Sequence, residues 1–292
     1  MKKSITLIIV FISLLGNVYA HTGAKIAADS MKVKTTYAEN TFEAPRIVLG
    51  QSIESPDKGD LILNIQHHFG YVNEGAYQFF GLDQATVRLG FEYGITNWLM
   101  VGIGRSSYGK TVDGSFKVKI LRQSNGGKNM PVSVSFFEDM GINTLKPKDL
   151  PSNSIFSNRL AFLSQILIAR KFNDKLSLQL APSWVHRSQA MQENNVFALG
   201  TSGRIKVGRH TSLDLEYYSI LSKQTASEYQ NSLSVGFNIQ AGGHVFQLYV
   251  SNSLGITGQN FIPGTQGNWL KGDILIGFNI TRRFHLIQPK YY

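Results

Sequence analysis

Apolar and polar residues alternate with a period of two along most of this chain. The clearest example runs from Asn231 to Ser251, where two alternating segments meet at Gly242-Gly243. A two-residue Gly-Gly connection favours a type I′ hairpin, because that turn needs a positive φ at both central positions. We therefore expect Ala241 to pair with His244. This register gives the hairpin one wholly apolar face and one face of small, amide, hydroxyl and aromatic groups.

Twelve segments bounded by turn residues show this alternation. Their connections are alternately short, as at 208–210, and mostly long, as at 140–157. Short turns at one end and longer loops at the other are typical of an outer-membrane barrel with an even strand number. The sequence therefore predicts an all-β fold, a single antiparallel up-and-down transmembrane β-barrel of twelve strands. The expected strands are Gly59 to Gly70, Gln84 to Tyr93, Trp98 to Ser106, Ser115 to Arg122, Pro131 to Asp139, Asn158 to Phe172, Leu176 to Arg187, Asn195 to Val207, Thr211 to Ser219, Asn231 to Ala241, His244 to Ser253 and Leu270 to Phe284.

The start of the chain has the features of a secretory signal peptide. Met1 to Ala20 contains two lysines, a short apolar stretch and a small-residue cleavage site. We expect a signal peptide at 1–20, an N-terminal mature segment at 21–58, a transmembrane barrel at 59–284 and a tail at 285–292. Segment 21–58 has a polar start and one short apolar run, so it is either an extension into the periplasm or a plug in the lumen. The expected location is the outer membrane of a Gram-negative envelope.

Composition and charge exclude several classes of protein. The chain has no Cys, which excludes disulfides, thiol catalysis and cysteine metal sites. No segment after the signal offers roughly 18 consecutive apolar residues, so a helical membrane protein is also excluded. The net charge is +10, but the basic residues are scattered and form no stripe interleaved with aromatics. We expect outer-membrane lipid as a partner, with a small solute or an envelope protein as further candidates, and no nucleic acid.

Five stretches carry a resemblance to a known family: 98–107, 110–114, 167–172, 176–180 and 242–247. Through them the chain, from about Thr41 to Phe284, resembles a family of Bacteroidetes outer-membrane β-barrels, the domain of unknown function 5777. The resemblance implies a barrel and an outer-membrane location. The family has no assigned activity, so it implies no functional residue.

The segment from Gly104 to Thr111 matches the phosphate-loop pattern of nucleotide-binding proteins. That mechanism needs a following helix whose first amides receive the phosphates. Here a β segment follows instead. We therefore expect a plain strand, loop and strand, with no nucleotide and no cofactor.

His186 and Ser188 are the only catalytic candidates, and they are weak ones. Residues two apart on a strand project from one face, and Asn194 or Asn195 could orient the imidazole that deprotonates the hydroxyl. This layout is similar to that of the outer-membrane phospholipase, another twelve-stranded barrel. Trp184 on the same face favours an interfacial aromatic girdle instead. No metal site is expected.

Charged residues on the inward faces give a more interpretable signal. The register across the turn at 208–210 places Arg204 opposite Asp214, with Glu216 on the same face, and Arg88 and Glu92 share the inward face of the second strand. Buried charges of opposite sign indicate a structural pair. The alternative is a charged constriction that selects solutes.

Taken together, these patterns favour a barrel without a catalytic site, either a narrow pore or a plugged scaffold. Two alternatives stay open. One is a lipid-modifying barrel enzyme that uses His186 and Ser188, and the other is a structural or docking partner in an envelope complex. No residue identifies a substrate.

Overall fold

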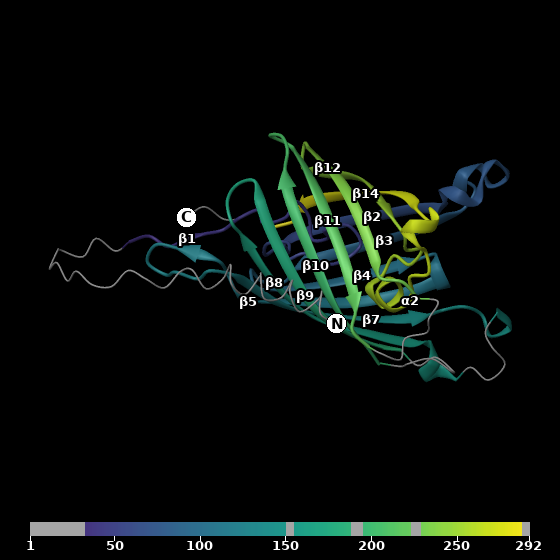
Figure 1. Cartoon of the computed structure of the whole chain (residues 1–292). Helices are drawn as coiled ribbons and strands as arrows, with labels where there is room; N and C mark the ends of the chain where they lie inside the picture. Colours follow the sequence, from purple (N-terminus) through teal and green to yellow (C-terminus); the bar gives the residue numbers. More distant parts are fainter. Residues whose placement is uncertain (1–32, 150–154, 188–194, 223–228, 288–292) are drawn as a thin grey trace.

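The computed structural model describes residues 33–149, 155–187, 195–222 and 229–287, and in them twelve antiparallel strands close into a barrel (Figure 1). Each strand pairs with the next along the chain, and β14 pairs with β2 to close the ring. The predicted fold class is confirmed. The barrel strands are β2 (Asp60–Tyr71), β3 (Ala85–Gly94), β4 (Leu99–Ser106), β5 (Thr111–Leu121), β7 (Ser133–Asn143), β8 (Leu160–Lys171), β9 (Leu176–Arg187), β10 (Asn195–Lys206), β11 (Thr211–Ile220), β12 (Ser232–Ala241), β13 (His244–Ser251) and β14 (Leu275–His285).

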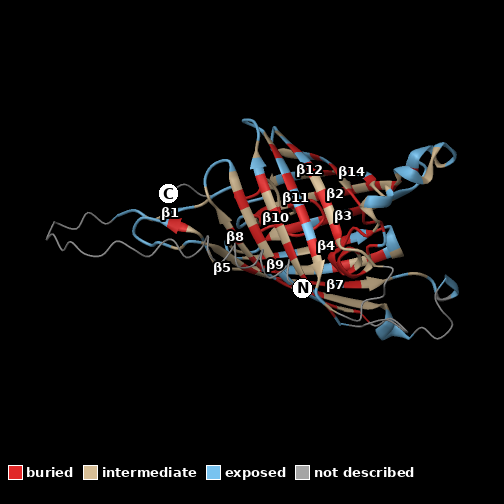
Figure 2. Ribbon diagram, viewed as in Figure 1, coloured by how far each residue is buried: buried red, intermediate tan, exposed pale blue. Residues whose placement is uncertain are grey.

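The alternation along each strand separates an outward face from an inward one. In the hairpin of β12 and β13, Ala241 pairs with His244 as predicted, and both turn glycines have positive φ. On β13, Leu248 points outward and is 61% exposed, whereas its neighbours Gln247 and Tyr249 are buried. The same change from exposed to buried recurs along the strands (Figure 2). The apolar faces therefore form the outside of the barrel, and the polar faces line its lumen.

Three strands begin or end four or more residues away from their predicted positions. Strand β5 starts at Thr111 rather than Ser115, and β7 runs from Ser133 to Asn143. Strand β14 starts at Leu275, not Leu270, because a 3₁₀ turn, η6 (Trp269–Lys271), precedes it. This turn ends at Gly272, where φ is +80°. An isolated left-handed glycine breaks the extended backbone that a strand needs.

The segment before β2 lies partly outside the barrel and partly within it. A short strand β1 (Thr36–Tyr37) pairs with β6 (Ser124–Asn125) in a separate two-stranded sheet. Residues 41–56, which we name the lumen segment, then enter the barrel at the end that carries the short turns. Its apolar side chains Phe42, Ile47, Val48 and Leu49 are at most 1% exposed. The predicted signal peptide and residues 21–32 lie outside the described part of the chain, as does the tail beyond residue 287.

The long connection between β13 and β14 enters the barrel from the opposite end. Residues 252–267, which we name the lumen loop, include the short helix α2 (Gly258–Gly264). Ile256, Phe261 and Ile262 of this loop are fully buried, and α2 packs against β8, β9 and β11. The ring of Phe261 meets Tyr218 edge-on, with 5.1 Å between the ring centroids. The lumen is thus filled from both ends. In the described residues no helix is long and apolar enough to cross a membrane.

Candidate functional site

The lumen segment folds back on itself in a tight turn deep in the barrel. The amide of Ile47 donates to the carbonyl of Gly50 at 2.9 Å, and the amide of Ser52 donates to the carbonyl of Pro45 at 2.8 Å. These two bonds satisfy part of the turn's own backbone. The remaining amides and carbonyls near its tip point to the barrel wall, because a buried backbone group needs a partner.

Glu216 on β11 receives the amides at the tip of the turn. Its carboxylate accepts from the amides of Leu49 and Gly50 at 3.2 and 3.0 Å, and from Val48 at 3.4 Å. Successive amides that converge in a turn make an anion-binding concavity. Hydrogen bonds to a charged acceptor are about twice as strong as neutral ones. Glu216 is therefore the main anchor of the lumen segment.

Wall donors hold the carbonyls of the same segment. Four side chains, from β5, β9, β13 and β14, donate hydrogen bonds to the main chain of the segment. The bonds are Gln247 Nε2 to Ile47 O at 2.6 Å, Asn279 Nδ2 to Val48 O at 2.9 Å, Gln179 Nε2 to Gln51 O at 2.8 Å, and Lys117 Nζ to Ser52 O at 2.8 Å and Glu54 O at 2.7 Å. The wall thus recognises the backbone of the lumen segment.

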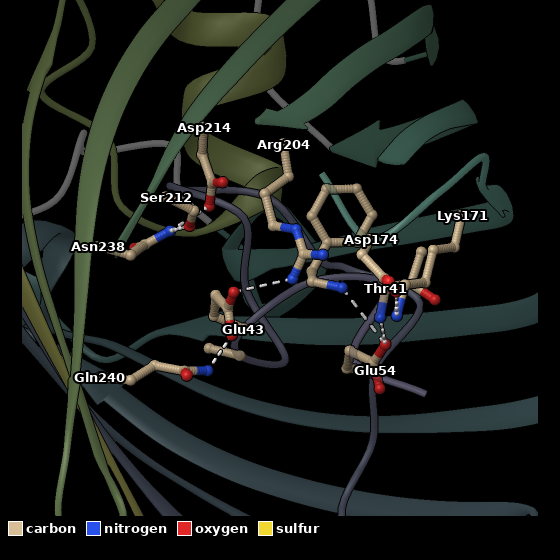
Figure 3. A network of polar contacts seen from close by, with 12 residues as sticks. Thr41, Glu43, Glu54, Lys171, Asp174, Arg204, Ser212, Asp214, Asn238 and Gln240 are labelled. Carbon is tan, nitrogen blue, oxygen red and sulfur yellow. Dashed lines mark hydrogen bonds and ion pairs between the residues drawn. The ribbon is translucent and has the colours of Figure 1, made fainter. Parts of the chain in front are cut away.

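One side chain of the lumen segment forms an ion pair with the wall (Figure 3). Arg204 and Asp214 lie opposite each other on β10 and β11, as predicted. The guanidinium of Arg204, however, pairs with Glu43 at 2.8 Å, while Asp214 accepts from Asn238 at 2.7 Å. Gln240 also donates to Glu43. This partner was not predicted, because Glu43 reaches the wall only when the lumen segment is in place.

The inward charges of β3 also find partners other than each other. Arg88 forms a two-bond ion pair with Asp113 on β5 and donates to Gln66 at 3.2 Å. Glu92, on the same face, keeps a buried Oε2 with no hydrogen-bond partner in the described residues. Asp113, Asp139 and Lys117 were not among the residues singled out from the sequence. Their positions in the alternation of β5 and β7 were the available signal.

The catalytic candidate His186 lies on the outward face near the long-loop end of β9. Its Nδ1 lies 2.9 Å from Oδ1 of Asn195, which also accepts from Nε1 of Trp184 at 3.2 Å. The rings of Phe162 and Trp184 flank the imidazole. Ser188 and Asn194 lie outside the described residues. The described contacts of His186 are thus those of an aromatic belt.

The phosphate-loop pattern lies on a strand, a single turn and a strand. Strand β4 ends at Ser106, the 3₁₀ turn η3 (Tyr108–Lys110) follows, and β5 begins at Thr111. The helix that a phosphate loop requires is replaced by β5. Within the described part of the chain, no group of three or more His, Asp or Glu side chains could hold a metal ion.

The family model described as a membrane-bound β-barrel domain, DUF5777, matches residues 42–284. The chain belongs to this family. The match begins inside the lumen segment and ends in the closing strand β14, so the DUF5777 domain includes the buried turn as well as the barrel. Comparison with curated proteins gives no significant match.

Several solved porins are similar to this DUF5777 barrel. The NanC porin is 8% identical over 76% of this chain and 97% of its own, with a TM-score of 0.49. The KdgM porin is 9% identical over 76% of this chain and 98% of its own, with a TM-score of 0.46. The outer-membrane channel DcaP of Acinetobacter baumannii is 10% identical over 68% of this chain and 63% of its own, with a TM-score of 0.33.

Proposed function

We propose that this protein is a non-enzymatic outer-membrane barrel that acts as a gated narrow pore and rests closed. The outward apolar faces contact membrane lipid, as the alternation on β13 illustrates. The lumen segment closes the passage from the short-turn end, which is the periplasmic end in barrels of this kind. Small solutes pass only when the segment leaves.

The cradle of Glu216 is the observation that carries this proposal. A single wall carboxylate holds the amides of Val48, Leu49 and Gly50 at the deepest point of the segment. Removing the negative charge weakens three contacts at once. Glu216 is therefore the wall group that makes the most hydrogen bonds to the segment among the described residues.

The chemistry of the wall supports a gate in preference to a permanent core. Side chains such as Gln179, Gln247 and Asn279 hold the segment by hydrogen bonds, and water can replace these when the segment leaves. The segment also buries the apolar side chains of Phe42, Ile47, Val48 and Leu49, and exposing them to water on opening is unfavourable, so the closed state is the resting one. The segment continues into β2 through residues 57–59, and on its other side β1 pairs with β6 outside the barrel.

Single-channel recording in a planar bilayer tests the proposal. We expect the refolded full-length protein to be silent for most of the recording and Glu216→Gln to open more often, by about tenfold for a loss near 1.4 kcal/mol. Glu138→Gln is the matched control, because Glu138 lies on the outward face of β7, where it accepts a hydrogen bond from Ser164 on β8, away from the lumen segment. A wild-type protein that conducts steadily, or a Glu216→Gln variant as silent as the control, would contradict the gate.

A further inference from the structure

The lumen wall carries more buried carboxylates than buried cations. Among the buried side chains of the barrel strands, without the strand-end residues Asp60 and Arg187, five are acidic and three are basic. The acids therefore exceed the bases by two. Adding Asp60 and Arg187 adds one acid and one base, so the excess stays at two. The eight are Glu92, Asp113, Asp139, Asp214 and Glu216, with Arg88, Lys117 and Arg204. A passage lined by one excess sign of charge attracts counter-ions.

Arg46 brings a further cation into this wall from the lumen segment. The charged wall groups around its guanidinium are Arg88, the carboxylates of Glu92, Asp113, Asp139 and Glu216, and Lys117. Its Nη1 donates to a carbonyl of its own turn at 3.0 Å, and its buried Nε has no hydrogen-bond partner in the described residues. The turn therefore holds Arg46 in the region of the acids.

Three of the wall acids keep unpaired oxygen atoms. Oε2 of Glu92, Oδ1 of Asp139 and Oδ1 of Asp214 are buried and have no hydrogen-bond partner within the described part of the chain. Asp113, in contrast, uses both oxygens on Arg88. Unpaired carboxylate oxygens in a narrow passage can replace water around a cation and select it over anions.

We propose that the open barrel conducts small monovalent cations in preference to anions, and that Arg46 is a tethered counter-ion that occupies this cation path in the closed state. The inference rests on the proposed function, because it concerns what passes once the lumen segment has left.

The charges that remain after opening favour this selectivity. Arg88 stays neutralised by Asp113, and Arg204, on losing Glu43, still faces Asp214 across the strands. Among the buried wall groups of the described residues, this leaves Lys117 as the one cation without an acidic partner, against the three carboxylates of Glu92, Asp139 and Glu216. Cations at the short-turn mouth, among them Lys119 and Arg283, lie at the solvent end, where salt screens them more strongly than groups inside the lumen.

The lumen loop leaves the side of β3 and β5 as the polar path. Its helix α2 packs against β8, β9 and β11, and its Gln259 lies near Asp139 and Gly141 on β7, whereas Glu92 and Asp113 project from β3 and β5. The loop is tied at both ends to β13 and β14, so it narrows the passage in the open state too. A narrow passage with fixed carboxylates favours small cations over large solutes.

The reversal potential of a full-length variant with an unseated lumen segment tests the selectivity. Gly50→Val serves this purpose without changing the wall, because a Cβ at Gly50 would lie 2.3 Å from the Tyr218 oxygen. In a KCl gradient we expect a potassium to chloride permeability ratio of about 3 or more, reduced about twofold by Glu92→Gln or Asp139→Asn. Glu138→Gln, on the outward face, is expected to leave the ratio unchanged. A ratio at or below one, or a ratio that ignores both lumen substitutions, overturns the proposal.

A second measurement on the closed protein tests the role of Arg46 without relying on opening. Since the chain has no Cys, Val48→Cys gives one buried thiol whose labelling by a membrane-impermeant maleimide reports departure of the segment. We expect Arg46→Gln to speed labelling about tenfold in the otherwise wild-type protein, and much less in a protein that already carries Glu92→Gln. Equal effects of Arg46→Gln in these two proteins would overturn the proposal that Arg46 is a counter-ion to the wall acids. In the bilayer recordings, a folded Gly50→Val protein that never opens would contradict the proposed gated pore. Openings that favour chloride would leave the gated pore standing and contradict only the proposed cation selectivity.

Discussion

The α-carbon of Gly50 lies directly against the phenol of Tyr218, so that a Cβ at this position would be 2.3 Å from the phenolic oxygen and 2.9 Å from Oε2 of Glu216. The tip of the lumen segment therefore approaches β11 as closely as a backbone can. Only glycine allows the amide of residue 50 to reach the carboxylate at 3.0 Å.

Adding a methyl group at Gly50 should unseat the turn. Overpacking at a buried site costs about 1–3 kcal/mol, so Gly50→Ala should speed maleimide labelling of Val48→Cys by about tenfold or more. Gly114→Ala is the control, because a Cβ there meets no atom within 4 Å. Equal labelling in the two variants would show that the contact with Tyr218 does not hold the segment.

Lys117 should matter through its two bonds to the main chain of the segment. Lys117→Met leaves the carbonyls of Ser52 and Glu54 without their donor, at a cost of about 1–3 kcal/mol. We expect faster proteolysis of the lumen segment in the folded barrel. Lys175→Met, in an exposed short turn, is the control and should leave the proteolysis rate at the wild-type value. If Lys175→Met speeds proteolysis as much as Lys117→Met does, the effect does not come from the two bonds of Lys117.

The ion pair of Arg204 with Glu43 should show strong coupling. Either Arg204→Met or Glu43→Gln leaves a buried group without its partner, and breaking such a pair costs about 3–5 kcal/mol. The double variant should recover part of that loss, with a coupling energy of about 1–3 kcal/mol in a double-mutant cycle on segment release. Additive losses would indicate that the two side chains act independently.

A second close approach, between Gly277 and Tyr249, lies in the wall itself. A Cβ at Gly277 would be 2.3 Å from Cζ of Tyr249 on the neighbouring strand β13. Gly277→Ala should destabilise the barrel by about 1–3 kcal/mol in urea unfolding followed by gel migration. Adding Tyr249→Leu should restore part of the stability, and failure of this rescue would locate the strain elsewhere.

Asp273 should stabilise the connection at 268–273, just before β14, in a pH-dependent way. The backbone amide of Asn268 and the side chain of Asn73 donate to its carboxylate and lower its pKa. A lowered pKa stabilises the folded loop above the usual carboxyl range, and this stabilisation is lost as the pH falls through the lowered value. Trp269 fluorescence, with Trp98 and Trp184 replaced by phenylalanine, should therefore change only in strongly acidic solution. Asp273→Asn should abolish this transition, and an unchanged transition would assign it to another group.

The alternation of the chain was sufficient to predict the barrel, because strand faces depend on period-two patterns that are local in sequence. The hairpin register at Gly242-Gly243 and the opposition of Arg204 and Asp214 both follow from it and are confirmed. The partner of Arg204 does not follow, because Glu43 lies 161 residues away and pairs with it through the lumen. Contacts between a strand and a distant irregular segment leave no periodic pattern in the sequence.

The lumen loop escaped prediction for a related reason. Its buried residues Phe261 and Ile262 stand in a long connection without alternation, so nothing in the pattern distinguishes an inserted loop from an exposed one. The start of β14 was placed too early because Leu270 and Ile274 continue the apolar alternation of the strand. The turn at Gly272, where φ is positive, ends the extended backbone although the apolar alternation of the sequence continues through it.

The closing seam between β14 and β2 sets an order of events for assembly. The lumen segment is synthesised first and β14 last, so the ring cannot close until the final strand pairs with the first. The lumen loop immediately precedes β14 and is tied to it, so the last hairpin carries the loop inward as it docks. We therefore expect the lumen loop to enter the barrel as β14 pairs with β2, so that closure of the ring and filling of the lumen from this end occur together.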